Sequence, residues 1–124
     1  MKLRECQLRG EESLSIVRRG KWVWKQYKPL DPRGRWPSAN AWREQLGARV
    51  AASQEIPHIN PVRRWFIERG IVVTPWVAAV RETTGHDVAK LRAILPRWIG
   101  DVTARNVIVG ADGPVLIDFC VNHA

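Results

Sequence analysis

The sequence predicts an α+β domain, because strand-like and helix-like segments follow one another in a hairpin-rich order. Two short runs rich in aromatic and β-branched residues come first, and a helix-length segment with an apolar stripe follows. Two later pairs of apolar runs are each joined by turn residues, with a second helical segment between the pairs. This order is typical of antiparallel strands with helices packed beside them. At 124 residues, the chain has the length of one domain with its own core.

The first two expected strands lie within residues 14–17 and 21–27. The second is rich in aromatic and β-branched residues, and strand alternation puts Val23, Lys25 and Tyr27 on one face. The side chain of Lys25 is therefore expected to lie beside apolar side chains.

A basic, proline-flanked loop at residues 29–37 precedes the first helix, which is expected over residues 41–53. Ser38 or Asn40 is the expected N-cap. The apolar residues of this segment recur at helical spacing and should form its buried stripe, namely Trp42, Leu46 and Val50.

Residues 62–67 and 71–77 form the next pair of expected strands, joined by a turn at residues 68–70. Pro75 indicates that the second of these strands is an edge strand or ends early. A second helix is expected from Asp87, whose carboxylate suits the positive end of the helix dipole. Pro96 should kink or end that helix.

The most informative stretch is residues 100–119, where polar residues surround a predicted hairpin. Asp101 and Asn106 lie five apart in a loop, two apolar runs follow around a Gly-Ala-Asp-Gly turn, and the second run ends on Asp118. Carboxylate and amide oxygens are hard ligands of the kind that Mg²⁺ takes together with water and phosphate oxygens. The stretch therefore predicts a site for a metal and a phosphorylated ligand.

The sequence Gly-Asp-Val-Thr-Ala-Arg-Asn-Val-Ile-Val, followed by Val-Leu-Ile-Asp-Phe, resembles the catalytic-loop and metal-binding motifs of the protein-kinase-like superfamily. The closest likeness is to its atypical branch, which includes RIO-type kinases, lipopolysaccharide (Kdo-type) kinases and aminoglycoside phosphotransferases. The resemblance covers residues 100–119 by motif, and the rest of the chain by the order of elements only. It implies a minimal kinase-like fold that binds ATP and Mg²⁺.

The resemblance also implies roles for individual residues in the C-terminal motif. Asp101 matches the catalytic aspartate that orients the acceptor hydroxyl and takes its proton. Asn106 matches the metal-binding asparagine, and Asp118 matches the aspartate that bridges Mg²⁺ to the nucleotide phosphates.

Further roles fall on the N-terminal part of the chain. Lys25 matches the lysine that pairs with the α- and β-phosphates, and Glu44, in the following helix, matches its glutamate partner. Residues 77–80 match the hinge at which adenine hydrogen-bonds to the backbone, which makes Val77 and Ala79 expected cofactor contacts.

The resemblance divides the chain into an N-lobe-like part, residues 1–79, and a reduced C-lobe-like part, residues 80–124. No Gly-x-Gly-x-x-Gly precedes Lys25, and the sequence given ends shortly after Asp118, before the segments that bind the acceptor in kinases. We therefore expect a truncated, minimal unit. An acidic or protein partner is one candidate to supply the missing lobe.

Composition limits the remaining possibilities. The net charge of +8 favours acidic partners such as nucleotides, although the basic residues are scattered along the chain. The cysteines, Cys6 and Cys120, form no disulfide framework, the three histidines have no metal-ligand spacing, and no apolar run is long enough to span a membrane. With no signal-peptide pattern at Met1, the sequence predicts a cytoplasmic protein without a membrane partner.

Three functions remain open from the sequence. The first is an ATP- and Mg²⁺-dependent phosphotransferase acting on a hydroxyl. The second is a catalytically inactive, pseudokinase-like binding module, which the absent Gly-rich loop favours. The third is nucleic-acid binding through the basic surface, which ranks last because no nucleic-acid-binding motif accompanies the charge.

Overall fold

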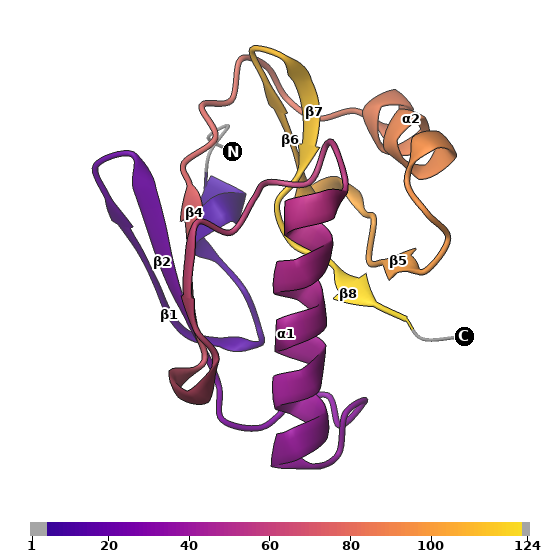
Figure 1. Ribbon diagram of the computed structural model, residues 1–124. Helices are drawn as coiled ribbons and strands as arrows, with labels where there is room; N and C mark the ends of the chain where they lie inside the picture. The colour runs from indigo at the N-terminus through magenta and orange to yellow at the C-terminus, as the bar shows by residue number, and fades with distance from the viewer. Residues whose placement is uncertain (1–4, 123–124) are drawn as a thin grey trace.

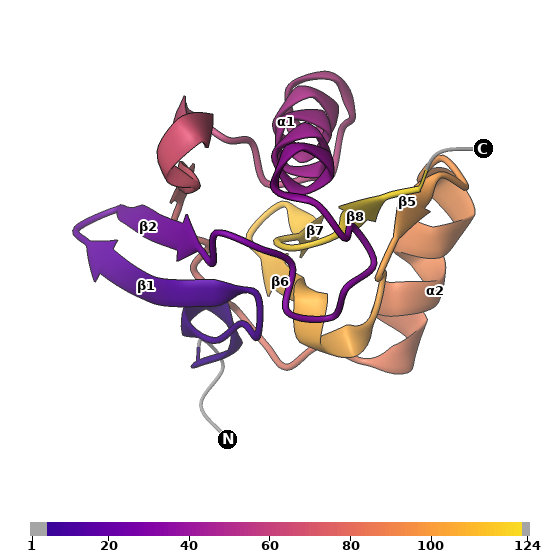
Figure 2. The same cartoon turned by 90° about the horizontal axis from the view of Figure 1, so that it is seen from below.

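The α+β class predicted from the sequence is confirmed by the computed structural model, which describes residues 5–122. Two α-helices and eight short strands occur in this range, together with three 3-10 turns. Helix α1 stands in the middle of the molecule, with a sheet on one side and α2 on the other (Figures 1 and 2).

The largest sheet has the strand order β1-β2-β4-β3, and all of its neighbouring strands are antiparallel. Its strands are β1 (Ser13–Arg19), β2 (Trp22–Tyr27), β3 (Arg64–Phe66) and β4 (Ile71–Pro75). The two predicted strand pairs are therefore joined into one sheet through β2 and β4. Lys25 lies opposite Val72 in that pairing, on the face it shares with Val23 and Tyr27.

Pro75 marks the end of β4, as one of the two sequence-based alternatives predicted. The other alternative, an edge strand, is wrong, because β4 lies between β2 and β3. The turn before β4 is η2 (Ile67–Arg69), which ends on Gly70 with a φ of 66°. A Cβ atom at Gly70 would lie 3.2 Å from the carbonyl oxygen of Tyr27, so a glycine suits both the backbone angle and the space.

Helix α1 (Ala39–Glu55) packs against the face of the sheet that carries Lys25. Ser38 is the N-cap, and its Oγ accepts the N–H of Ala41 at 3.0 Å. The predicted apolar stripe is buried, with Trp42, Leu46 and Val50 packed beside Tyr27 and Val72.

The chain then passes to helix α2 (Gly85–Ile94), which begins at a capping box between Thr84 and Asp87. The helix ends just before Pro96, which confirms that the proline terminates it.

The C-terminal motif forms two small antiparallel ladders. The predicted hairpin is confirmed as β6 (Val107–Gly110) paired with β7 (Gly113–Leu116). Strand β5 (Ile99–Gly100) precedes the hairpin in the sequence and β8 (Cys120–Val121) follows it, and these two strands pair with each other. The remaining elements are two 3-10 turns, η1 (Glu5–Leu8) and η3 (Ala104–Asn106).

The core consists of two apolar clusters that meet at α1. One lies between α1 and the sheet, and the other joins α1 to α2 and the β6–β7 hairpin, with Leu91, Val107 and Leu116 among its members. Helix α1 thus forms a wall shared by both halves of the molecule. Within residues 5–122, no helix has the length and apolar character needed to cross a membrane.

Leu116 provides a test of the second cluster, because its side chain is 0 % exposed. Leu116→Ala should lower the free energy of unfolding by about 2–5 kcal/mol, through lost apolar burial and the cavity left behind. Leu14→Ala on β1 is the matched control, since Leu14 is 61 % exposed. Its effect should stay within about 0.5 kcal/mol in urea unfolding, and equal losses in the two variants would contradict this packing.

Asp87 provides a test of the α2 cap through pH. Its carboxylate accepts hydrogen bonds from Arg81 at 2.7 and 2.8 Å and from the Thr84 N–H at 2.9 Å, and these hold its pKa well below the usual range. A lowered pKa in the folded state stabilises the fold above the unfolded value of about 3.9, and this stability is lost as the pH falls through the folded-state pKa.

Asp87→Asn should therefore lower the melting temperature at pH 7, and the difference from the wild type should shrink steadily below about pH 4. Asp112→Asn, in the exposed β6–β7 turn, is the control and should change little at either pH. A difference for Asp87→Asn that is constant from pH 7 to pH 2 would contradict the stabilising role of the ionised carboxylate.

Candidate functional site

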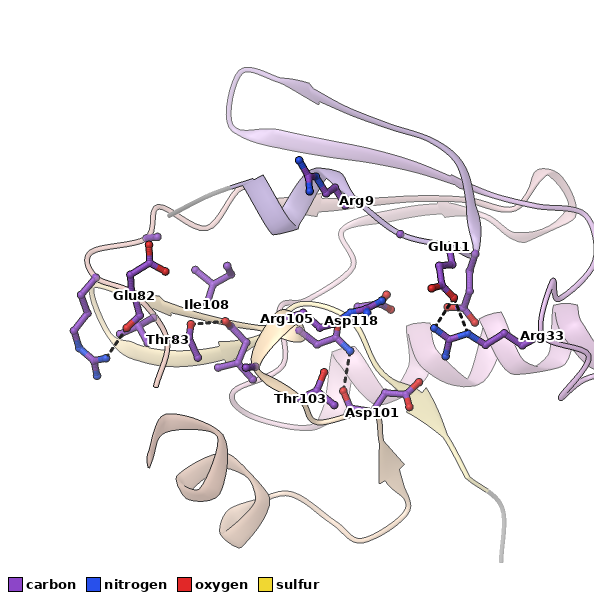
Figure 3. A pocket seen from close by; sticks show the side chains of 18 residues that line it. Arg9, Glu11, Arg33, Glu82, Thr83, Asp101, Thr103, Arg105, Ile108 and Asp118 are labelled. Atoms are coloured by element: carbon purple, nitrogen blue, oxygen red, sulfur yellow. Dashed lines mark hydrogen bonds and ion pairs between the residues drawn. The ribbon is translucent and has the colours of Figure 1, made fainter. Parts of the chain in front are cut away.

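A pocket of about 900 Å³ lies beside the C-terminal motif (Figure 3). One wall is the segment before β1, and the opposite wall is the loop from Asp101 to the β6–β7 hairpin. The connector after β4 closes one end, where Figure 3 shows Glu82 and Thr83, and the Glu11–Arg33 ion pair lies at the other. Its volume is in the range of pockets that take small organic ligands, about 300–1,000 Å³.

The loop that carries Asp101 and Asn106 is held by a hydrogen bond between these two residues. Asp101 has a φ of 60°, in the left-handed region, and its carbonyl oxygen accepts a hydrogen bond from Asn106 Nδ2 at 2.8 Å. Both residues line the pocket. A Cβ at Gly100, directly before Asp101, would lie 2.6 Å from both Cys120 Sγ and Asn122 Nδ2, so a larger residue there would have to displace these side chains.

Asp118 lies between β7 and β8 and joins the motif to the sheet. Its Oδ1 accepts the N–H of Phe119 at 2.9 Å, and its Oδ2 lies 3.6 Å from Lys25 Nζ on β2. Burial is the largest single effect and disfavours the charged form of Lys25, but Asp118, Tyr27 and Glu12 together outweigh it, so the pKa of Lys25 lies above its ordinary value. The ion pair brings together two residues from opposite parts of the sequence.

The structure does not bring Glu44 to Lys25. Glu44 lies on the exposed side of α1, and the carboxylate that contacts Lys25 belongs to Asp118. The charged residue that α1 directs toward the site is Arg49, which is 5 % exposed. Arg49 Nη1 lies 3.9 Å from Asp118 Oδ1, so this helix delivers a cation where the resemblance implied an anion.

Glu12 neutralises that cation and was not singled out from the sequence. Its two carboxylate oxygens accept hydrogen bonds from Arg49 Nη1 at 3.0 Å and Nη2 at 3.2 Å, and Glu12 is 8 % exposed. One sequence signal pointed to Arg49, since it falls on the buried stripe, one helical turn after Leu46 and next to Val50. Glu12 carried no comparable signal, because it lies in an irregular segment.

Arg35, also absent from the sequence-based set, covers the carboxylate of Asp101. It comes from the proline-flanked loop before α1, and both of its terminal nitrogens lie 3.4 Å from Asp101 Oδ2. Nη2 is also 3.6 Å from Glu12 Oε2. The expected catalytic aspartate is therefore paired with a guanidinium.

The two expected hinge residues differ in their surroundings. Ala79 lines the large pocket. Both backbone polar groups of Val77 are engaged by the side-chain amide of Gln7: Gln7 Nε2 donates to the Val77 carbonyl at 2.6 Å, and the Val77 N–H donates to Gln7 Oε1 at 3.0 Å.

Asn106 and Asp118 fit Mg²⁺ only in combination with a phosphorylated ligand. Both line the large pocket and the small cavity beside Lys25, and together they offer one carboxylate and one amide oxygen. Within residues 5–122, no group of three His, Cys, Asp or Glu residues could hold a metal ion by itself. This donor set suits Mg²⁺ when phosphate oxygens and waters complete its coordination.

The Arg49–Glu12 pair can be tested by removing either charge. Arg49→Ala leaves the buried Glu12 with only the more distant Arg35, 3.6 Å away, and should cost about 3 kcal/mol in the free energy of unfolding. Arg43→Ala on the same helix is the control, because among residues 5–122 Arg43 makes only an exposed side-chain hydrogen bond to Asn40, and it should cost about 0.5 kcal/mol or less.

The double variant Glu12→Ala, Arg49→Ala should be much less destabilised than the sum of its single variants, as measured by chemical unfolding. Strictly additive losses would show that the two side chains do not act as a pair.

No family model, curated protein or solved structure was found to match this chain in any of three comparisons. The case for a function therefore depends on the geometry of the pocket and its charged residues.

Proposed function

We propose that this protein binds ATP with Mg²⁺ and transfers the γ-phosphoryl group to a hydroxyl acceptor. The observation that carries the proposal is the convergence of Lys25, Asn106 and Asp118 from separate elements, at the edge of a pocket that Asp101 also lines. Packing alone gives no reason for a lysine, an amide and two carboxylates to line a pocket and a small cavity that share Asn106 and Asp118. The cytoplasmic location expected from the sequence is part of this proposal, since ATP is abundant there.

Each residue has a defined task in such a transfer. Bound Mg²⁺ would neutralise phosphate charge, and Asp118 and Asn106 are the residues that would hold it. Lys25 adds a fixed positive charge for the non-transferred phosphates. Asp101 would orient the acceptor hydroxyl and accept its proton as the new O–P bond forms and ADP leaves.

The ion pair between Lys25 and Asp118 is compatible with these tasks. At 3.6 Å the two groups are close enough to position each other, yet longer than a tight charge-assisted hydrogen bond. Phosphate oxygens and a metal would replace part of this mutual contact with stronger ones. The pair thus holds both side chains near the positions in which a nucleotide needs them.

A non-catalytic, nucleotide-sensing module is the second candidate, and Arg35 is the observation that favours it. A guanidinium 3.4 Å from Asp101 Oδ2 already engages the carboxylate that phosphotransfer would need for the acceptor hydroxyl. In this candidate the site binds a nucleotide but transfers no phosphate. Loss of Asp101 would then leave the function unchanged.

Two measurements on one set of variants separate these candidates. In a thermal-shift assay, ATP with Mg²⁺ should raise the melting temperature of the wild type and of Asp101→Asn, but not that of Asp118→Asn. In a transfer or ATP-hydrolysis assay, both variants should lose at least about 100-fold in rate, because each removes a group used in the transition state. Asp112→Asn, in the exposed hairpin turn, should resemble the wild type in both assays.

Full activity in Asp101→Asn and Asp118→Asn would refute phosphotransfer at this site. Binding without turnover in the wild type would favour the non-catalytic candidate. If no nucleotide raises the melting temperature with Mg²⁺, both candidates fail.

A further inference from the structure

Gln7 makes an unusual contact with the connector that follows β4. It lies on η1, 70 residues before Val77, and its amide is hydrogen-bonded to both backbone groups of that one residue. Gln7 is 6 % exposed, so water does not compete for these bonds. Such a closed, two-bond contact fixes η1 across one side of the site, and Figure 3 shows Arg9, just after η1, above the pocket.

The chemistry of this contact identifies what else Val77 can bind. A primary amide presents an acceptor oxygen beside a donor nitrogen in a single plane. The pairing edge of adenine presents the same combination, an acceptor ring nitrogen beside a donor amino group. The N–H and C=O of Val77 would therefore accept either group, but only one at a time.

The space around Gln7 leads to the same conclusion. Gln7 lines a cavity of about 50 Å³ together with Lys25, Asn106 and Asp118. A water molecule takes about 30 Å³, whereas pockets for small organic ligands measure about 300–1,000 Å³. A nucleobase cannot share this part of the site with the side chain of Gln7.

From this geometry we infer that Gln7 is a built-in competitor of the nucleobase. In the state described here, the amide occupies the base-recognition edge at Val77, and an adenine nucleotide binds there only after η1 has withdrawn. The inference rests on the proposed function, since it concerns the same site. The inference adds a regulatory step to the proposed function, because anything that draws η1 away from Val77 would open the nucleotide site.

Competition of this kind weakens nucleotide binding in a predictable way. The apparent dissociation constant rises by the inverse of the fraction of molecules in which Val77 is open. Removing the amide of Gln7 raises that fraction without altering Lys25, Asn106 or Asp118. Gln7→Ala should therefore bind ATP with Mg²⁺ more tightly than the wild type, by about tenfold if the two bonds contribute about 1.4 kcal/mol in total.

The experiment compares four proteins: the wild type, Gln7→Ala, Gln7→Glu and Gln54→Ala. Glutamate keeps the size of the side chain but lacks the donor for the Val77 carbonyl, so it should act in the same direction as alanine. Gln54 also donates its amide to a backbone carbonyl, that of Val62, but its own side chain lines neither the large pocket nor the small cavity, which makes it the matched control. Its removal should leave nucleotide affinity unchanged.

Two readouts are needed. Amide hydrogen exchange without nucleotide should show that the Val77 N–H is protected in the wild type and exchanges faster in both Gln7 variants, while the amides of β2 and β4 remain protected. Isothermal titration with ATP and Mg²⁺ should then show tighter binding by the Gln7 variants only.

The outcomes separate this inference from the proposed function. Equal affinities in the wild type and in folded Gln7 variants would overturn the competitor role and leave the nucleotide site intact. Weaker binding by the Gln7 variants would also overturn it, because the side chain would then support the site. If no variant binds nucleotide although the Val77 amide is released, both the inference and the proposed function fail.

Discussion

The buried guanidinium of Arg49 is the constraint on which the site depends. Removing this charge from water costs free energy, which hydrogen bonds, an ion pair and aromatic contacts around the guanidinium must offset. Glu12 pairs with two of its nitrogens, Gln45 accepts from Nε at 3.0 Å, and three aromatic rings lie around it, those of Tyr27, Trp36 and Trp42. These partners come from α1, from the segment before β1, from β2 and from the loop after it. One cation thus fixes four parts of the chain around α1.

This constraint extends to the C-terminal motif through Gln45. The same amide oxygen that accepts from Arg49 also accepts the N–H of Val121, and Gln45 Nε2 donates to the Val121 carbonyl at 2.8 Å. Strand β8 is thereby held against α1, and Asp118 lies just before that strand. The position of Asp118 opposite Lys25 is therefore set by a polar network in the interior, in addition to apolar packing. Asp118, which we propose as a ligand of Mg²⁺, is thus linked to the buried side chains of Gln45 and Arg49.

Local sequence patterns were sufficient for both helices, for the strands of the large sheet and for the β6–β7 hairpin. The alternation in residues 21–27, the stripe of α1 and the turn between Val109 and Val115 each depend on neighbouring residues, so they could be recognised without knowledge of the fold. The expected residues of the motif, from Asp101 to Asp118, also lie close in sequence. Glu12, Arg35 and Gln7 could not be predicted in the same way, because the partners considered above, Arg49, Asp101 and Val77, lie 37 to 70 residues away. Glu44 shows the converse error: a helix can be placed correctly while its face toward the site is misjudged.

The left-handed backbone of Asp101 limits how this position can evolve. Aspartate, asparagine and glycine tolerate a φ of 60°, whereas most other residues strain the backbone there. A side chain at the neighbouring Gly100 would also have to displace those of Cys120 and Asn122. A lineage that lost the need for the carboxylate would therefore drift mainly to asparagine or glycine. In a related sequence, aspartate at this position would then indicate that the carboxylate is needed, and asparagine or glycine that it is not.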